Sequence, residues 1–220
     1  MVQPHEIIRS KRKTLSISID GFGRLIVRAP KAFSEERIFA FIKEKESWIL
    51  KKQAERKGAG ISLPPKNLHG YKLLLLGEYY TVITYDGKKV GLDSERKLLY
   101  LPQEKTEYRI KKWIKENALR ILTKVTEDKA KAMDVAYRSV SVSSARSRWG
   151  VCTYDNVIRY SYRLLYVPKE VLEYVVVHEL AHTKHKDHSK RFWAEVAAHV
   201  PDWKEKRKWL KTHGALMEIF

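Results

Sequence analysis

The sequence predicts an α+β fold in which a β-rich N-terminal region with one helix, residues 1–103, precedes a helix-rich domain, residues 104–220. Two patterns lead to this prediction. Short runs of alternating apolar and polar residues dominate up to about residue 101, which is typical of half-buried strands. From about Glu104 apolar residues recur at helical spacing instead. With 220 residues and 44% hydrophobic content, the chain can bury one large core or two small ones.

The N-terminal region begins with a predicted hairpin. Residues 15–19 alternate between apolar and polar, Gly21-Phe22-Gly23 turns the chain, and residues 25–27 return. Ser34 is then expected to cap a single helix, because the residues after it place apolar side chains on one face. These side chains are Ile38, Phe41, Ile42, Trp48 and Ile49.

A connector and further strands complete this region. Residues 58–70 contain Pro64-Pro65 and several glycines, which indicates a linker. Strands are expected at 71–76 and 79–85, and Asp86-Gly87 predicts a hairpin turn after them. Shorter strands are expected near Val90 and at residues 98–101.

The C-terminal domain starts with a long predicted helix that ends near Met133. Strands at 137–144 and 157–164 are expected to form a small antiparallel sheet, joined through Arg148–Cys152. Three helices should follow. They begin after Pro168, after Ser189 and after Pro201, and the last one is basic.

The net charge of +18 is spread along the chain. Lys and Arg outnumber Asp and Glu by 14 to 7 in residues 1–60, by 15 to 10 in 61–135 and by 15 to 9 in 136–220. This distribution suits a solvated surface, but it also favours an acidic partner such as nucleic acid or a nucleotide. Because no segment has the pattern of a nucleic-acid-binding module, we expect at most weak, non-specific binding.

The composition also bears on the cellular compartment. No apolar run approaches the roughly 18 residues of a membrane span, and the polar, basic segment Met1–Lys13 lacks the apolar core of a signal peptide. The single cysteine, Cys152, excludes an internal disulfide and fits a reducing compartment. We expect a cytoplasmic protein without membrane contact, in which Cys152 is a buried structural thiol rather than a metal ligand.

The segment His178-Glu179-Leu180-Ala181-His182 has the H-E-x-x-H pattern. Residues four apart lie on one face of a helix, so His178 and His182 can direct two imidazoles at one cation. Glu179 then lies within reach of a metal-bound water, as the general base of zinc hydrolases does. The apolar run at 171–177 argues against a solvated surface helix.

Four histidines compete for the role of third ligand: His185, His188, His199 and His213. His185 would lie about 10 Å from His178 along the helix axis, too far to share one ion. The two later histidines require a longer return of the chain. His188 directly precedes Ser189, a good N-cap, so it can be directed back from the entrance of a new helix. His188 therefore completes the predicted zinc site with His178 and His182.

Further segments form a recognisable set. They are Ser147–Cys152, Ile158-Arg159, Arg163-Leu164, Pro168, Tyr174–His182 and His188–Trp193, with the basic segment before Leu15, Val27–Pro30, Lys45–Ile49 and Leu76–Tyr80 in the N-terminal region. This set resembles the YgjP-like metallopeptidase family, which is related to the SprT-like and WLM zinc proteases. The resemblance covers essentially the whole chain, and residues 188–193 are its most specific piece. Val151 and Ser161 depart from the usual family pattern, and neither is a ligand.

The resemblance implies a zincin-like metallopeptidase domain, with His178, His182 and His188 as Zn²⁺ ligands and Glu179 as the catalytic residue. Two alternatives stay open. Some members of the family have been described as nucleotide pyrophosphatases, and the positive charge would suit a nucleoside triphosphate. A DNA-associated protease similar to the SprT-like relatives is the other alternative. No Gly-rich phosphate loop is present, which favours peptide substrates.

The residue that stabilises the oxyanion of the reaction stays unassigned. Four residues on the strand before the metal helix are candidates. These are Arg159, Tyr160, Tyr162 and Arg163.

Overall fold

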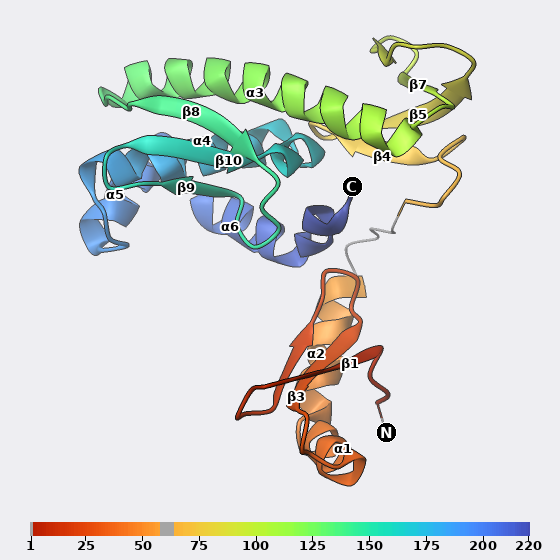
Figure 1. Ribbon diagram of the computed structural model, residues 1–220. Coiled ribbons are helices and arrows are strands. Elements are labelled where there is room, and N and C mark those ends of the chain that lie inside the picture. Colours follow the sequence, from red (N-terminus) through yellow and green to blue (C-terminus); the bar gives the residue numbers. More distant parts are fainter. Residues whose placement is uncertain (1, 58–63) are drawn as a thin grey trace. The chain divides into compact units, whose positions relative to one another are not determined.

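The computed structural model describes residues 2–57 and 64–220 and confirms the α+β class (Figure 1). The chain divides into two compact units, Met1–Leu63 with Lys211–Glu218, and Pro64–Leu210 with Ile219–Phe220. The first part of the predicted connector, residues 58–63, lies outside the described residues.

The first unit contains a three-stranded sheet in the order β1-β3-β2. Its strands are β1 (Glu6–Ser10), β2 (Ser16–Ile19) and β3 (Leu25–Pro30). β2 and β3 form the predicted antiparallel hairpin, whereas β1 pairs with β3 in parallel. The sequence does not predict β1, because only Ile7 and Ile8 interrupt its polar and charged residues.

Two helices stand where one was expected, α1 (Glu35–Glu44) and α2 (Glu46–Lys57). Ser34 caps α1 as predicted, since its hydroxyl accepts a hydrogen bond from the Arg37 N–H at 3.3 Å. The backbone leaves the helical range at Lys45 (φ −98°, ψ 10°), and this separates the two helices. The core of the unit consists of Leu25, Val27, Ala29, Ile38, Ile42 and Ile49.

The second unit begins with a four-stranded sheet in the order β4-β5-β7-β6. Its strands are β4 (Lys72–Leu75), β5 (Glu78–Tyr85), β6 (Gly91–Asp93) and β7 (Leu98–Pro102). The hairpin predicted at Asp86-Gly87 is wrong, because β5 pairs with β7 in parallel and β6 pairs only with β7. The sheet packs on the helix α3 (Thr106–Met133). The boundary expected between residues 103 and 104 therefore lies inside this unit.

A second sheet of this unit has the order β8-β10-β9. Its strands are β8 (Ser139–Ser143), β9 (Gly150–Cys152) and β10 (Val157–Ser161). β10 is antiparallel to β9 but parallel to β8, so the expectation of an antiparallel sheet is wrong for β8. The reason is that the chain first returns as β9, whose hairpin with β10 makes β10 run in the direction of β8. β9 is thus an edge strand.

The helices α3 and α4 (Lys169–Lys184) pack against each other and on one face of this sheet, α3 beside β8 and α4 beside β9 (Figure 1). The hydroxyls of Thr126 on α3 and Tyr160 on β10 are hydrogen bonded at 3.2 Å. Gly150 lies opposite Tyr160 in the ladder and therefore faces the same helices. This arrangement places α4 directly over the edge strand.

The remaining elements are helical. The strand predicted through Leu164 ends at Ser161, and a 3₁₀-helix, η1 (Tyr162–Tyr166), leads to α4. After α4 come α5 (Lys190–His199), α6 (Trp203–Thr212) and the 3₁₀-helix η2 (Gly214–Glu218). The Ser189 hydroxyl accepts a hydrogen bond from the Phe192 N–H at 3.4 Å, which confirms the predicted cap of α5.

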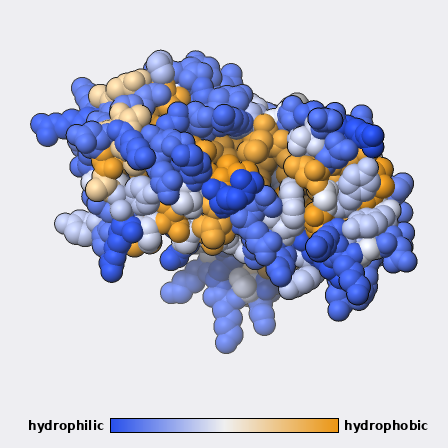
Figure 2. Space-filling model, turned by 90° about the horizontal axis from the view of Figure 1, so that it is seen from above, coloured by the Kyte–Doolittle hydropathy of each residue, from blue (hydrophilic) through white to orange (hydrophobic). Residues whose placement is uncertain are grey.

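Figure 2 shows hydrophilic side chains over most of one face, with hydrophobic residues gathered in smaller areas between them. Among the described residues, no helix combines the length and apolar character needed to cross a bilayer.

Candidate metal centre

The helix α4 places the two histidines of the H-E-x-x-H segment on one side. The residues before them are almost all buried and fix the helix in the core; they are Val171, Leu172, Tyr174, Val175, Val176 and Val177. His178 and His182 follow one turn apart, and their ring centroids are 5.0 Å from each other. Two imidazoles therefore lie side by side on a helix that cannot rotate without exposing its apolar face.

His188 meets these two rings from the loop after α4. Its Nε2 lies 3.3 Å from the Nε2 of His178, and its ring centroid is 4.8 Å from that of His182. One nitrogen from each ring lies within 4.8 Å of the others. Ligands at zinc–nitrogen distances of 2.0–2.1 Å in a tetrahedron are about 3.3–3.4 Å apart. The pair formed by His178 and His188 already has this spacing.

His185 contacts the three-histidine cluster through its backbone carbonyl, and its ring is not one of the three that converge. Its carbonyl oxygen lies 2.9 Å from Nδ1 of His182. When Nδ1 carries the proton and donates it to this carbonyl, the free Nε2 of His182 faces the other two rings. In contrast, Nδ1 of His178 is buried and has no hydrogen-bond partner among the described residues.

The three rings share an aromatic support on α5. The ring of Phe192, which is fully buried, has its centroid 4.9 Å from His178, 4.4 Å from His182 and 4.8 Å from His188. Trp193 stacks on His188 at 5.7 Å and on Trp203 of α6 at 4.1 Å. Phe192 and Trp193, in the first turn of α5, thus pack directly against the imidazoles.

Two of the three imidazoles, His178 and His182, are uncharged at neutral pH. Burial, together with the smaller effects of the His182 and His188 rings and of Arg207, lowers the pKa of His178 to about 3. Burial also lowers the pKa of His182. A metal ion binds neutral imidazole, so these two side chains are in the form that a metal site needs. An all-imidazole set of three donors fits a transition metal such as zinc better than magnesium or calcium.

Glu179 is buried beside the rings, with 5% of its surface exposed. Burial raises the pKa of its carboxyl to about 8, and a hydrogen bond from the backbone of Cys152 opposes that shift. The carboxyl lies against the edge strand at Gly150, where an added Cβ would be 2.6 Å from Oε1 of Glu179. Only glycine allows β9 to approach the carboxyl this closely.

A small cavity of about 200 Å³ opens at this point. His178 and Glu179 form one part of its wall. The rest of the lining is Trp149, Gly150, Tyr174, Val175 and Leu210. The cavity is therefore largely apolar except where it meets the His178 ring and the Glu179 carboxyl.

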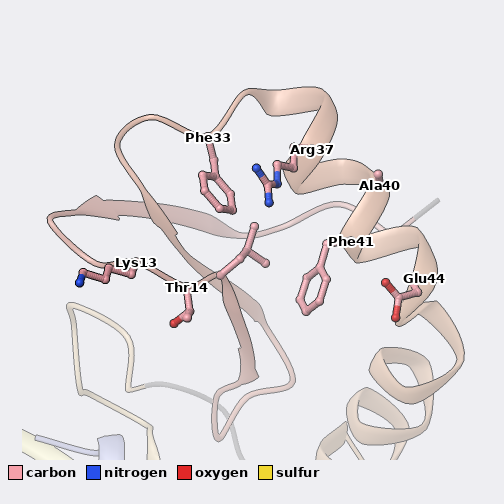
Figure 3. Close-up of a pocket in the computed structure, with 8 residues that line it drawn as sticks. Lys13, Thr14, Phe33, Arg37, Ala40, Phe41 and Glu44 are labelled. Atoms are coloured by element: carbon pink, nitrogen blue, oxygen red, sulfur yellow. The ribbon is translucent and has the colours of Figure 1, made fainter.

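A larger cavity, of about 500 Å³, lies in the first unit (Figure 3). Figure 3 shows Arg37 between the rings of Phe33 and Phe41, and its guanidinium lies 3.9 Å from the Phe33 centroid. The lining contains no histidine or cysteine, and its one carboxylate, Glu44, pairs with Lys45 at 2.6 Å. None of the predicted site residues lies there.

The structure separates most of the oxyanion candidates from the centre. Tyr160 is buried against Thr126, and the Tyr162 hydroxyl donates to the Phe220 carbonyl at 2.6 Å. Arg163 is buried and donates to the carbonyls of Ser144, Ile219 and Phe220. Arg159 is exposed and follows buried Ile158 on the strand, so it faces away from α3 and α4.

Cys152 is half-buried rather than fully buried, and its Sγ lies 3.5 Å from the Thr153 carbonyl oxygen. Burial raises the pKa of this thiol, which keeps it protonated. It does not belong to the group of three side chains that could together hold a metal ion.

Sequence reasoning missed three residues of the centre. Tyr174 lines the cavity and lies one helical turn before His178, a spacing that could have indicated it. The role of Gly150 has no local signal, because it depends on the approach of α4. Arg207 reaches the centre from α6, and nothing in its sequence neighbourhood distinguishes it from the other basic residues of that helix.

These features define a metallopeptidase-type site, and comparison with known proteins agrees. The family model of the YgjP-like metallopeptidase domain matches residues 13–213. The chain therefore belongs to the YgjP-like family and is a metal-dependent peptidase. The crystal structure of the metallopeptidase zymogen of Pyrococcus abyssi abylysin is similar at 23% identity and a TM-score of 0.39, covering 41% of this chain and 92% of that one. No curated protein matches the chain significantly.

Proposed function

We propose that the chain is a zinc-dependent peptidase in which His178, His182 and His188 hold Zn²⁺ and Glu179 is the general base. The convergence of one nitrogen from each imidazole within 4.8 Å carries this proposal. The buried carboxyl of Glu179 supports it, because it lines the same small cavity as His178. A peptide bond presented there would meet both groups at once.

The chemistry follows from these side chains. His178, His182 and His188 would hold the zinc, which would supply an activated water for attack on the peptide carbonyl. Glu179 then accepts the proton of the attacking water and delivers it to the leaving amine.

The dimensions of the cavity favour peptides over nucleotides. At about 200 Å³ it is smaller than the roughly 300–1,000 Å³ of typical small-molecule sites, so it suits a single side chain. Its wall offers aromatic and aliphatic groups, without a Gly-rich loop or a row of cations for a triphosphate. No observation on the described residues favours the nucleotide or the DNA-associated alternative.

The first test concerns the metal. The purified protein should contain one zinc per chain, measured by mass spectrometry of the metal. His188→Ala should lose most of it, because two imidazoles of one helix leave the site open. His185→Ala is the matched control, since only its backbone contacts the site. Full zinc content in His188→Ala would show that His188 is not a ligand.

The second test separates metal binding from chemistry. Glu179→Gln should keep the zinc and the fold but lose peptide hydrolysis by roughly 10²–10⁴-fold, the typical contribution of a general base. Casein, short peptides and nucleoside triphosphates should be assayed side by side with the parent and with EDTA. Parent-like peptidase activity in Glu179→Gln would exclude this residue as the base, and cleavage of nucleotides alone would exclude the peptidase proposal.

A further inference from the structure

A cation without a carboxylate partner lies beside the metal centre. The guanidinium of Arg207, on α6, lies 5.1 Å above the ring of Trp193. The Trp193 ring is itself 5.7 Å from His178 and 5.7 Å from His188. Arg207 is exposed, and in residues 2–57 and 64–220 no carboxylate forms an ion pair with it.

Acids of α4, α5 and the start of α6 are paired with lysines. Glu173 pairs with Lys129 at 2.7 Å, Glu195 pairs with Lys184 at 3.0 Å and Asp202 pairs with Lys206. A bound metal cation would make this region more positive still. An anionic group of the substrate is therefore the missing partner.

The same face of α6 also contributes to the apolar cavity. Leu210 follows Arg207 by three residues, so the two side chains lie next to each other on the helix surface. Across the cavity stand Trp149, Tyr174 and Val175. One small region thus combines a pocket for an apolar side chain, a free guanidinium and the metal-binding ring.

We propose that this region recognises the C-terminal residue of a peptide, with its apolar side chain in the cavity and its α-carboxylate on Arg207. The inference rests on the proposed peptidase function and makes the enzyme a carboxypeptidase. Water adds to the carbonyl carbon of the last peptide bond and the C–N bond breaks. The departing amine takes a proton from Glu179, so the products are a shortened peptide and one free apolar amino acid.

The arrangement fits a chain end better than an internal residue. An internal residue would bring a neutral amide to Arg207 and leave the guanidinium unpaired. A guanidinium binds a carboxylate through two parallel hydrogen bonds, which gives both affinity and orientation. A nucleotide phosphate would satisfy Arg207 but would leave the apolar cavity of about 200 Å³ unfilled.

A binding experiment tests the inference without catalysis. Zinc-loaded Glu179→Gln protein is titrated by calorimetry with N-acetyl-leucine and with N-acetyl-leucinamide, which differ only in the carboxylate. The acid should bind at least about 10-fold more tightly, and Arg207→Gln in the same background should remove that difference. Lys208→Gln, which removes the same charge from the next residue of α6, should keep it.

Two outcomes of the titration overturn the inference. Equal binding of acid and amide would show that no carboxylate is recognised. If Arg207→Gln still bound the acid more tightly than the amide, a group other than Arg207 would bind the carboxylate. Because Arg207 is exposed on the helix surface, its substitution should leave the fold intact, which a thermal unfolding curve checks.

An activity experiment with the parent protein separates this inference from the proposed function. Peptides ending in leucine are supplied with a free or an amidated C-terminus, and mass spectrometry identifies the products. Release of free leucine with at least a 10-fold preference for the free acid is expected. Leu210→Ala should reduce the preference for C-terminal leucine over alanine by about 10-fold or more. Equal internal cleavage of both peptides would contradict the carboxypeptidase inference but agree with the proposed peptidase function. Cleavage of neither peptide would contradict the proposed peptidase function, and the titration would still test the role of Arg207 independently.

Discussion

The helix α4 and the loop that follows it hold their histidines in different ways. His178 and His182 belong to a helix whose other residues are packed in the core, and the preceding segment Val171–Val177 is almost fully buried. His188 is exposed and belongs to a segment without regular structure between α4 and α5. Packing therefore fixes two of the proposed ligands, whereas the third needs another restraint.

Polar contacts supply that restraint. The ammonium of Lys186 donates to the Thr153 carbonyl at 2.9 Å and to Oδ1 of Asn156 at 2.5 Å, so the loop is tied to the β9–β10 turn. Asp187 accepts a hydrogen bond from the Ser189 N–H at 3.1 Å. We therefore expect the stability of the fold to depend on the buried residues of α4, and the metal affinity to depend also on the polar contacts of the loop. Substitutions in the two regions should affect these two quantities separately.

The largest effect on stability should come from the buried part of α4. Leu172→Ala removes a fully buried side chain six residues before His178 and should lower the free energy of unfolding by about 2–5 kcal/mol. Zinc affinity of the folded fraction should not change, because the motif keeps its place on the helix. Urea unfolding and a zinc competition assay measure the two quantities.

Leu119→Ala provides the control for this prediction. Leu119 is 42% exposed on α3, so its truncation should change stability by no more than about 0.5 kcal/mol. Equal losses in the two variants, or a large loss of zinc affinity in Leu172→Ala, would contradict the separation between packing and metal binding.

The edge strand β9 positions the carboxyl of Glu179 through Gly150. Gly150→Ala would bring a Cβ to 2.6 Å from Oε1 of Glu179, and the carboxyl must move away. A displacement of about 1 Å in a reacting group can lower activity about 100-fold, so kcat/KM for peptides should fall by that factor with zinc content unchanged. Gly91→Ala is the matched control, since its Cβ would meet Tyr100 at an ordinary 3.8 Å.

The local part of the site could be predicted from the sequence, and the reason is that it depends on helix geometry. The spacing of His178 and His182 needs only 3.6 residues per turn, and Ser189 as an N-cap indicates where the chain turns after His188. The structure brings these three side chains together as expected. Glu179 likewise follows from its place in the motif.

What could not be predicted depends on contacts between distant segments. Alternation of apolar residues indicates a strand but not its partner, so the parallel pairings of β1 with β3, β5 with β7 and β8 with β10 were missed. The contact of Gly150 with Glu179 and the position of Arg207 depend in the same way on how β9 and α6 approach α4. No pattern within either segment encodes that approach.

A smaller effect should appear in the pH dependence of the metal-free protein. The pKa of Glu179 is about 8 in the folded chain against an ordinary 4.5, so between these values the folded state holds a proton that the unfolded state releases. Stability contributed by this group is complete below pH 4.5 and is lost as the pH rises to 8. Metal-free Glu179→Gln should therefore be more stable than the parent at pH 8 and equal to it near pH 4.5. Urea unfolding in EDTA measures this, and parallel pH profiles of the two proteins would contradict it.

The smallest effect should come from the loop and should appear in metal affinity alone. Lys186→Met removes the donors that tie the loop to Thr153 and Asn156, so His188 must be ordered when the metal binds. Loss of groups that orient metal ligands weakens metal binding by about 10–100-fold. Because the hydrogen bonds of Lys186 are solvent-exposed, we expect zinc affinity to fall by about 10-fold. Because the side chain is exposed, the free energy of unfolding should change by less than about 0.5 kcal/mol.

Lys190→Met is the control, since Lys190 is an exposed lysine two residues after His188. It should leave both the zinc affinity and the free energy of unfolding unchanged. Unaltered zinc affinity in Lys186→Met would mean that the cap of α5 at Ser189 is sufficient to hold the third histidine in place.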